Sequence, residues 1–144
     1  MAISHSVASL LQPNVVRIES GSTVSDVARV MAEKNVRNVF VMREGEPLGL
    51  VRDYDIITRV VARNLDPDIV KADEIMCKPV ASVKADAELF EIAAVMAQTG
   101  VRRVLVMQDA KILGTITAGD LLNIVSHFPR SSQRETLRSI AGLT

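Results

Sequence analysis

The chain contains one unit of sequence written twice, and this duplication limits the folds that it can adopt. When residues 11–63 are placed on residues 76–128, a constant offset of 65 residues aligns them without a gap. Fourteen of the aligned pairs are identical, whereas unrelated sequences of average composition would give about three or four. A fold for this chain therefore has to consist of two similar halves.

Both halves predict the same order of secondary structure, β-α-β-β-α. Each begins with a short extended segment and continues with apolar residues at helical spacing, and Thr23 with Asp26 resembles a helix-capping pair. Two β-branched runs joined by a turn follow and predict a hairpin, and a second helix closes the half. The extended segments are Val15–Ile18 and Val80–Val83; the helical stripes are Val24, Val27, Ala28 and Met31, and Leu89, Ile92, Ala93 and Met96; the hairpin strands are Val39–Met42 with Leu48–Val51, and Val104–Met107 with Leu113–Ile116; the closing helices are about Tyr54–Arg63 and Asp120–His127.

This order predicts an α+β fold in which the two halves pack through their sheets and bury the apolar stripes. The predicted domain organisation is an N-terminal helix (1–12), a first repeat (13–65), a linker (66–75), a second repeat (76–128) and a helical tail (129–144). In the N-terminal segment, Ser4–Gln12 has the apolar spacing of a short amphipathic helix. In the tail, the predicted capping box is Ser132 with Glu135, the apolar stripe is Leu137, Ile140 and Ala141, and the C-cap is Gly142.

A seven-residue motif closes the hairpin in both halves, as Gly49–Asp55 and as Gly114–Asp120. In each copy a strand ends, a short turn follows, and an aspartate lies at the start of a helix. Free N–H groups and the helix dipole favour phosphate at such a place, and a carboxylate there can accept two hydrogen bonds from ribose hydroxyls. The motif therefore predicts a nucleotide ligand.

Composition excludes several other classes of function. The 17 basic and 17 acidic residues cancel, which gives no broad attraction to nucleic acid or to an anionic membrane. The sequence has no apolar run long enough for a membrane span and no signal-peptide pattern at its start, so a cytoplasmic protein is expected. Cys77 is the single cysteine, which allows no internal disulfide, and His5 and His127 have no partner at metal-ligand spacing. No catalytic triad, P-loop or carboxylate pair is recognisable, and we predict that the chain is not an enzyme.

The sequence resembles the paired CBS domain, or Bateman module, the family named after cystathionine β-synthase. The family's repeats end in Gly-apolar-apolar-Thr/Ser-x-x-Asp-apolar, and residues 114–121 match this pattern except that Thr115 takes the first apolar position. The resemblance implies two CBS repeats packed as an intramolecular pair with pseudo-two-fold symmetry. It also implies adenosine-containing ligands in clefts between the repeats, and association into a dimer.

The resemblance assigns the ribose hydroxyls to Asp120, a hydroxyl contact to Thr117 and space for the ligand to Gly119. The first copy departs from the pattern, because Arg52 replaces the Thr/Ser that precedes Asp55. Two alternatives are open for Arg52. It either pairs with ligand phosphates or forms a salt bridge with Asp53 or Asp55 that closes the pocket.

The family's geometry also implies that each cleft borrows residues from the other repeat. The Asp120 cleft borrows Val36, Arg37 and Asn38, together with the segment Pro13–Val16, which includes Val16. The Asp55 cleft borrows Val101, Arg102 and Arg103, together with the segment Cys77–Val80, which includes Val80. Cys77, which aligns with Gln12, is expected at a pocket edge or in the core.

These observations predict a stand-alone regulatory module that binds AMP, ADP, ATP or S-adenosylmethionine and signals by a conformational change. We expect a homodimer, and the tail either packs on its own module or meets a dimer mate or an effector protein. The alternative function is a structural dimerisation or scaffold protein with vestigial ligand sites. A nucleotide-modifying enzyme lacks a recognisable base, nucleophile or metal set.

Overall fold

In the computed structural model, residues 10–126 and residues 130, 134 and 138 are described. The described residues divide into two compact units, and each unit has its own core. Residues Val15–Val80 form the first, here called the Asp55 unit. The described residues up to Asn14, together with those from Ala81 onward, form the second, here called the Asp120 unit.

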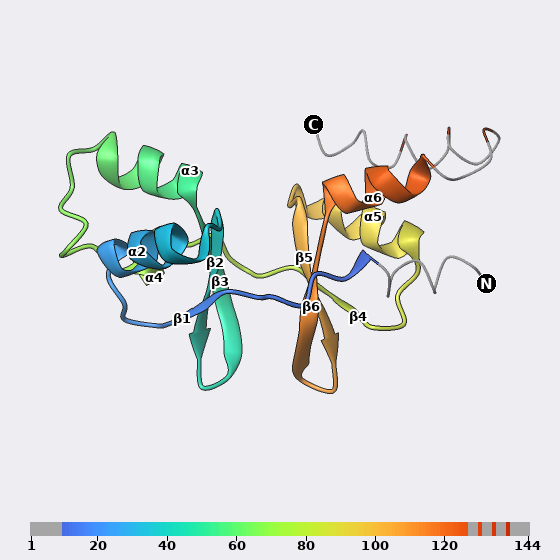
Figure 1. The fold of residues 1–144 in the computed structure, drawn as a ribbon, viewed down its shortest axis with the longest axis horizontal. Helices are drawn as coiled ribbons and strands as arrows, with labels where there is room; N and C mark the ends of the chain where they lie inside the picture. The colour runs from blue at the N-terminus through green and yellow to red at the C-terminus, as the bar shows by residue number, and fades with distance from the viewer. Residues whose placement is uncertain (1–9, 127–129, 131–133, 135–137, 139–144) are drawn as a thin grey trace. The chain divides into compact units, whose positions relative to one another are not determined.

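Each unit is a three-stranded sheet with helices packed against it (Figure 1). The first strand runs parallel to the second, and the second pairs antiparallel with the third. The elements of the Asp55 unit are β1 (Arg17–Glu19), α2 (Val24–Lys34), β2 (Asn38–Arg43), β3 (Glu46–Arg52), α3 (Asp53–Ile56), the π-helix η1 (Ile57–Val61) and α4 (Ala72–Ile75). Those of the Asp120 unit are β4 (Ser82–Lys84), α5 (Leu89–Thr99), β5 (Arg103–Gln108), β6 (Lys111–Thr117) and α6 (Ala118–Val125). The predicted β-α-β-β-α order and the α+β class are confirmed.

The duplication extends to the irregularities of the sheets. The β2–β3 ladder shifts register between Val41 and Met42, and the β5–β6 ladder shifts between Val106 and Met107, exactly one repeat later. A bulge of this kind bends the hairpin and re-aims the strand ends. Both motif aspartates consequently follow strands with the same shape.

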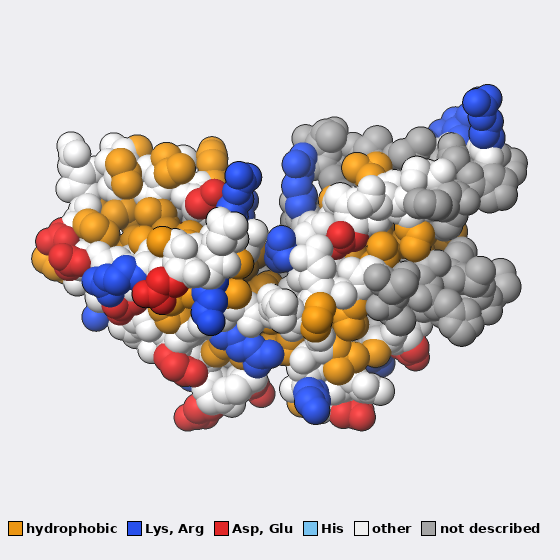
Figure 2. Space-filling model, viewed as in Figure 1, with side chains coloured by type: hydrophobic (Ala, Val, Ile, Leu, Met, Phe, Trp, Pro, Cys, Tyr) orange, Lys and Arg blue, Asp and Glu red, His pale blue; other side chains and the backbone are white. Residues whose placement is uncertain are grey.

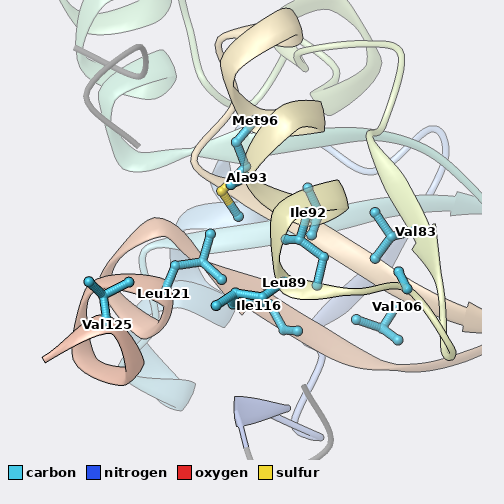
Figure 3. Packing of buried hydrophobic residues seen from close by; sticks show 11 residues of the cluster. Val83, Leu89, Ile92, Ala93, Met96, Val106, Ile116, Leu121 and Val125 are labelled. Atoms are coloured by element: carbon cyan, nitrogen blue, oxygen red, sulfur yellow. The ribbon is translucent and has the colours of Figure 1, made fainter. Parts of the chain in front are cut away.

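The core of the Asp120 unit shows how the helical stripe is used. Leu89, Ile92, Ala93 and Met96 of α5 pack on the apolar face of the sheet and on α6, as Figure 3 shows. Leu10 and Leu11 pack against the same cluster, so the described end of the predicted N-terminal helix covers the core of the second repeat. The rest of that helix lies outside the described residues, as do His5, His127 and the capping and apolar residues predicted for the tail.

Three local predictions differ from the structure. Strands β1 and β4 begin two residues later than predicted, because Val16 and Ala81 each give only a carbonyl to the neighbouring strand before regular pairing starts. Ala28 is exposed. It lies at the edge of the apolar stripe of the helix, and the sheet covers only the middle of that stripe. The closing helix of the first repeat is α only to Ile56 and continues as a π-helix.

The predicted linker (66–75) lies within the Asp55 unit. The Val24 and Ser25 N–H groups at the start of α2 donate to the Val70 and Pro67 carbonyls, at 2.9 and 3.0 Å. Thr23 also caps this helix in the predicted capping box with Asp26. These bonds satisfy N–H groups that an isolated helix would leave to water. None of the described helices has the length and apolarity that a bilayer crossing requires.

Candidate functional site

The two motif aspartates lie at matching places, each at the third position of the helix that follows a hairpin. Asp120 is in the first turn of α6, after β6, and Asp55 is in the first turn of α3, after β3. In both units a carbonyl from the preceding strand entry accepts the first helical N–H. Arg37 supplies it for Asp53 at 3.0 Å, and Arg102 supplies it for Ala118 at 2.9 Å. The helix start is therefore fixed by main chain in both units.

Asp120 forms a reciprocal capping box with Thr117. The Asp120 N–H donates to Thr117 Oγ1 at 3.1 Å, and the Thr117 N–H donates to Asp120 Oδ2 at 2.9 Å. The predicted pair is therefore also the helix cap, so capping and ligand binding do not exclude each other here. The carboxylate is half-buried, which leaves acceptor positions for a further donor.

Gln12 supplies that donor. Its Nε2 lies 3.1 Å from Asp120 Oδ1 and 3.0 Å from Oδ2. The main chain of Gln12 is held by an antiparallel bridge to Thr115, with N–O distances of 3.0 and 2.9 Å. Gly114 allows this approach, because a Cβ at that position would collide with the Gln12 carbonyl oxygen.

Arg103 places a cationic group in the same unit. It is half-buried at the start of β5, and its Nη1 donates to Thr115 Oγ1 at 3.0 Å. Burial lowers the pKa of Arg103, and the charge of Asp120 opposes that effect. The guanidinium keeps its charge because an arginine pKa starts far above neutral. A desolvated cation near a carboxylate with spare acceptors is suited to a ligand that carries both hydroxyls and an anion.

Asp55 has a different partner. The Arg52 guanidinium grips it with two bonds, Nε–Oδ2 at 3.0 Å and Nη2–Oδ1 at 2.7 Å, and the Arg52 N–H adds a third at 2.9 Å. The Asp55 side chain is 1% exposed, whereas that of Arg52 is 43% exposed. Of the two alternatives for Arg52, the structure shows the salt bridge with Asp55.

Cys77 completes the Asp55 cluster. Its thiol donates to the Asp55 oxygens, with Sγ–O distances of 3.6 and 3.7 Å. Its main chain pairs with Leu50 at 2.8 and 2.9 Å. Gly49 is buried under this segment, and a Cβ there would meet the Met76 side chain at 2.6 Å. Cys77 is thus the counterpart of Gln12, as the 65-residue offset requires.

The ionisation of the Asp55 pair follows from its contacts. Burial alone would raise the pKa of Asp55, but the hydrogen bonds from Arg52 outweigh burial and hold this pKa below its usual value. The hydrogen bond to Asp55 raises the pKa of Arg52 in turn. The pair is therefore ionised at neutral pH, and all strong acceptor positions of Asp55 are used.

The remaining predicted site residues have structural contacts within their own units. Val16, Val36 and Val101 pack at the edges of the two cores, Val80 is half-buried, and Asn38 faces Arg52 across the hairpin. Gly119 is exposed, and a Cβ there would meet only Thr117 Oγ1 at an ordinary 3.7 Å. Packing does not require this glycine. That each cleft borrows residues from the other repeat stays a prediction.

Sequence reasoning missed Gln12 as a contact of Asp120. The signal was present, because Gln12 aligns with Cys77, and Cys77–Val80 was the segment assigned to the Asp55 cleft. The segment predicted for the Asp120 cleft begins at Pro13, the residue after Gln12. The bridge to Thr115 is what brings Gln12 itself to the carboxylate.

Comparison with known proteins gives a consistent result. The family model described as "CBS domain" matches residues 7–62 and again residues 72–127. An uncharacterized protein of Methanopyrus kandleri is 29% identical over 134 residues, which is 92% of this chain and 68% of that protein.

Solved structures agree with the sequence matches. A CBS domain protein of unknown function from Thermoplasma acidophilum superposes with a TM-score of 0.72 at 28% identity, over 92% of this chain and 74% of that one. A hexameric CBS-CP12 protein from bloom-forming cyanobacteria gives 0.74 at 30% identity, over 90% of this chain and 75% of that one.

Proposed function

Because the chain belongs to the CBS-domain family as a tandem pair, we propose that it is a regulatory module that binds an adenosine-containing ligand at the Asp120 site. The ligand classes are AMP, ADP, ATP and S-adenosylmethionine. Binding changes the conformation of the module and thereby a surface that a partner protein reads. The ligand is bound and released without being converted.

The observation that carries this proposal is the set of groups around Asp120. Its carboxylate accepts a hydrogen bond from the main-chain N–H of Thr117 and is contacted by the neutral side-chain amide of Gln12. Two ribose hydroxyls can donate to the same oxygens. The guanidinium of Arg103 is a partner for phosphate, to which arginine binds in a bidentate manner. A diol and an anion on one small molecule are the chemistry of a nucleotide.

A thermal-shift panel of the four ligands tests the proposal, with calorimetry for affinity and chromatography of the ligand for turnover. A ligand at a hundred times its dissociation constant adds about 2.7 kcal/mol of stability. We expect at least one ligand to stabilise the wild type and to be recovered unchanged. If none does, the Asp120 site is not a nucleotide site; if the ligand is consumed, the protein is an enzyme.

A scaffold protein is the second candidate function, and the Asp55 cluster favours it. A motif aspartate that is buried and ion-paired with Arg52 is the expected state of a vestigial ligand site. The panel separates the candidates, because a scaffold gains no stability from any of the ligands.

We further propose that the module forms a homodimer through the outer face of α3 and η1. Ile57 and Val61 are 57% and 65% exposed on this helix, and Tyr54, Leu65 and Ile69 are exposed nearby. In Figure 2 hydrophobic side chains gather over this helix at the upper left. A contiguous apolar face on a soluble protein marks an interaction site, and the related CBS-CP12 protein is hexameric.

Light scattering at micromolar concentration tests the dimer. The double variant Ile57→Ser/Val61→Ser is expected to lower the mass to that of a monomer, because it removes apolar area from the contact. The matched control is Leu122→Ser, which changes the α6 residue equivalent to Ile57. A wild type that is monomeric with and without ligand contradicts the proposal.

A further inference from the structure

Gln12 occupies the carboxylate oxygens of Asp120 that a ribose would use. Its Nε2 lies 3.1 Å from Oδ1 and 3.0 Å from Oδ2, so a single donor atom faces both oxygens. A vicinal diol carries two O–H groups and would address the same two oxygens. The Gln12 amide and a ribose therefore compete for one acceptor edge.

We propose that Gln12 is an autoinhibitory side chain, which occupies the acceptor edge of Asp120 in the unliganded chain and is displaced when a ligand with a vicinal diol binds. This inference rests on the proposed function, since it specifies how the Asp120 site is controlled. It assigns to Gln12 the role of setting the affinity of the site.

The contacts of Gln12 allow its side chain to leave while its main chain stays. The main chain is held by the bridge to Thr115 and by close packing over Gly114. The side chain is exposed and neutral, so rotation about its χ angles returns the amide to water. Asp120 keeps its bond from the Thr117 N–H during this exchange, and the helix cap is preserved.

The Asp55 cluster shows what a fixed block looks like. The Asp55 carboxylate is buried and is held by the guanidinium of Arg52. A charged bidentate pair is much stronger than a bond from a neutral, exposed amide. The Asp120 site is thus blocked by a group that a ligand can replace.

A ligand can bind only to the molecules in which Gln12 has left the site. The apparent affinity is therefore the intrinsic affinity multiplied by the fraction of open molecules. This factor is the same for every ligand that has to displace Gln12, so the affinities for AMP and for 2′-deoxy-AMP fall in the same proportion. The contact consequently sets the affinity of the site.

Calorimetry with AMP, ATP and S-adenosylmethionine, each titrated separately, tests the proposal on three variants. Gln12→Leu keeps the side-chain volume and removes the donors, and we expect the affinity to rise about three- to tenfold. Gln12→Ala should give the same gain, which excludes an effect of leucine itself. Gln12→Lys places a cation against Asp120 and should abolish binding.

The matched control is Gln98→Leu, which changes an exposed glutamine of α5 in the same unit. It is expected to bind as the wild type does, and urea denaturation shows that each variant is folded. Titration with 2′-deoxy-AMP is a further check, because Gln12→Leu should raise the affinity for AMP and for 2′-deoxy-AMP by the same factor. The side-chain amide signals of Gln12, followed by NMR, should move to the positions of a free glutamine when AMP binds.

The outcomes are distinguishable. If the wild type binds AMP and Gln12→Leu binds it equally or more weakly, Gln12 is not inhibitory and the inference is overturned, while the proposed function stands. If only the Gln12→Leu and Gln12→Ala variants bind, the inference is supported in its strongest form. If neither the wild type nor these variants bind any of the three ligands, and ADP also gives no thermal shift, the proposed function fails and the inference fails with it.

Discussion

The Asp55 and Asp120 clusters begin from the same motif and arrive at opposite chemical states. Both aspartates follow a bulged hairpin, both start a helix, and both are approached by a segment that pairs with the third strand. Asp55 is buried and closed by a cation, whereas Asp120 is half-buried and meets a neutral amide. The residue three positions before the aspartate makes this difference, since threonine caps the helix with a hydroxyl and arginine neutralises the carboxylate.

The comparison shows that the same motif aspartate has different partners in the two units. Arg52 holds Asp55 in a structural ion pair. Tyr54 supports this pair, since the Arg52 guanidinium lies 5.5 Å from the centre of its ring, a distance at which cation–π attraction adds stability. The four predictions below test this division of roles.

The largest expected effect is on stability in the Asp55 unit. Arg52→Met leaves the buried Asp55 carboxylate without its counter-ion, and we expect the free energy of unfolding at pH 7 to fall by about 3 kcal/mol. Adding Asp55→Leu should recover much of this loss, because no buried charge then remains. Gln12→Ala, measured by the same urea denaturation, should cost less than about 1 kcal/mol. Equal costs for Arg52→Met and Gln12→Ala would remove the distinction between the two clusters.

The next effect is on binding in the Asp120 unit. Asp120→Ala removes the acceptor for the ribose hydroxyls, and calorimetry should show a loss on the order of 2 kcal/mol or more. Part of the helix cap is also lost, at a cost of about 1 kcal/mol in stability, so the protein stays folded. Asp86→Ala, at an exposed turn of the same unit, is the matched control. An unchanged affinity in Asp120→Ala would leave Asp120 with the capping role alone.

Arg52→Thr converts the first motif toward the second. Threonine can cap Asp55 as Thr117 caps Asp120, and it frees the Asp55 oxygens for a ligand. We expect AMP to bind at a second site. An AMP concentration of about five times the dissociation constant of this site would add roughly 1 kcal/mol to the free energy of unfolding. Arg52→Lys keeps the positive charge and should not create the second site. If Arg52→Thr instead loses a preference for ATP over AMP, Arg52 binds phosphate rather than closing the site.

The smallest effect is a dependence on acid. Because the folded protein holds the pKa of Asp55 below its usual value, the stability from this group is present above the unfolded pKa of about 3.9 and is lost as pH falls through the folded pKa. Between pH 4.5 and 3.5 the wild type should lose about 0.5 kcal/mol more than Asp55→Asn, as measured by urea unfolding. Parallel pH profiles would show that Asp55 is not stabilised as an anion.

The sequence by itself determined the architecture. The 65-residue offset, the helical stripes and the two hairpins predicted the β-α-β-β-α order, because apolar periodicity and turn residues act over a few positions. A motif and a departure from it are both visible in a linear sequence, so Asp120, Thr117 and Arg52 are candidate positions from the sequence alone; their roles in ligand binding stay predictions. The capping pair of Thr23 and Asp26 is a further local feature that was predicted and is confirmed.

The tertiary structure decided which partner each aspartate has. Gln12 is 108 residues from Asp120 in the chain, and only the bridge to Thr115 brings their side chains together. The sequence left two alternatives for Arg52, a ligand phosphate and a salt bridge with a neighbouring aspartate. The structure shows the salt bridge with Asp55, because a buried carboxylate without a partner would be costly. Hydrogen bonds between segments that are distant in the sequence depend on how those segments pack in the folded chain, and local sequence patterns do not encode that packing.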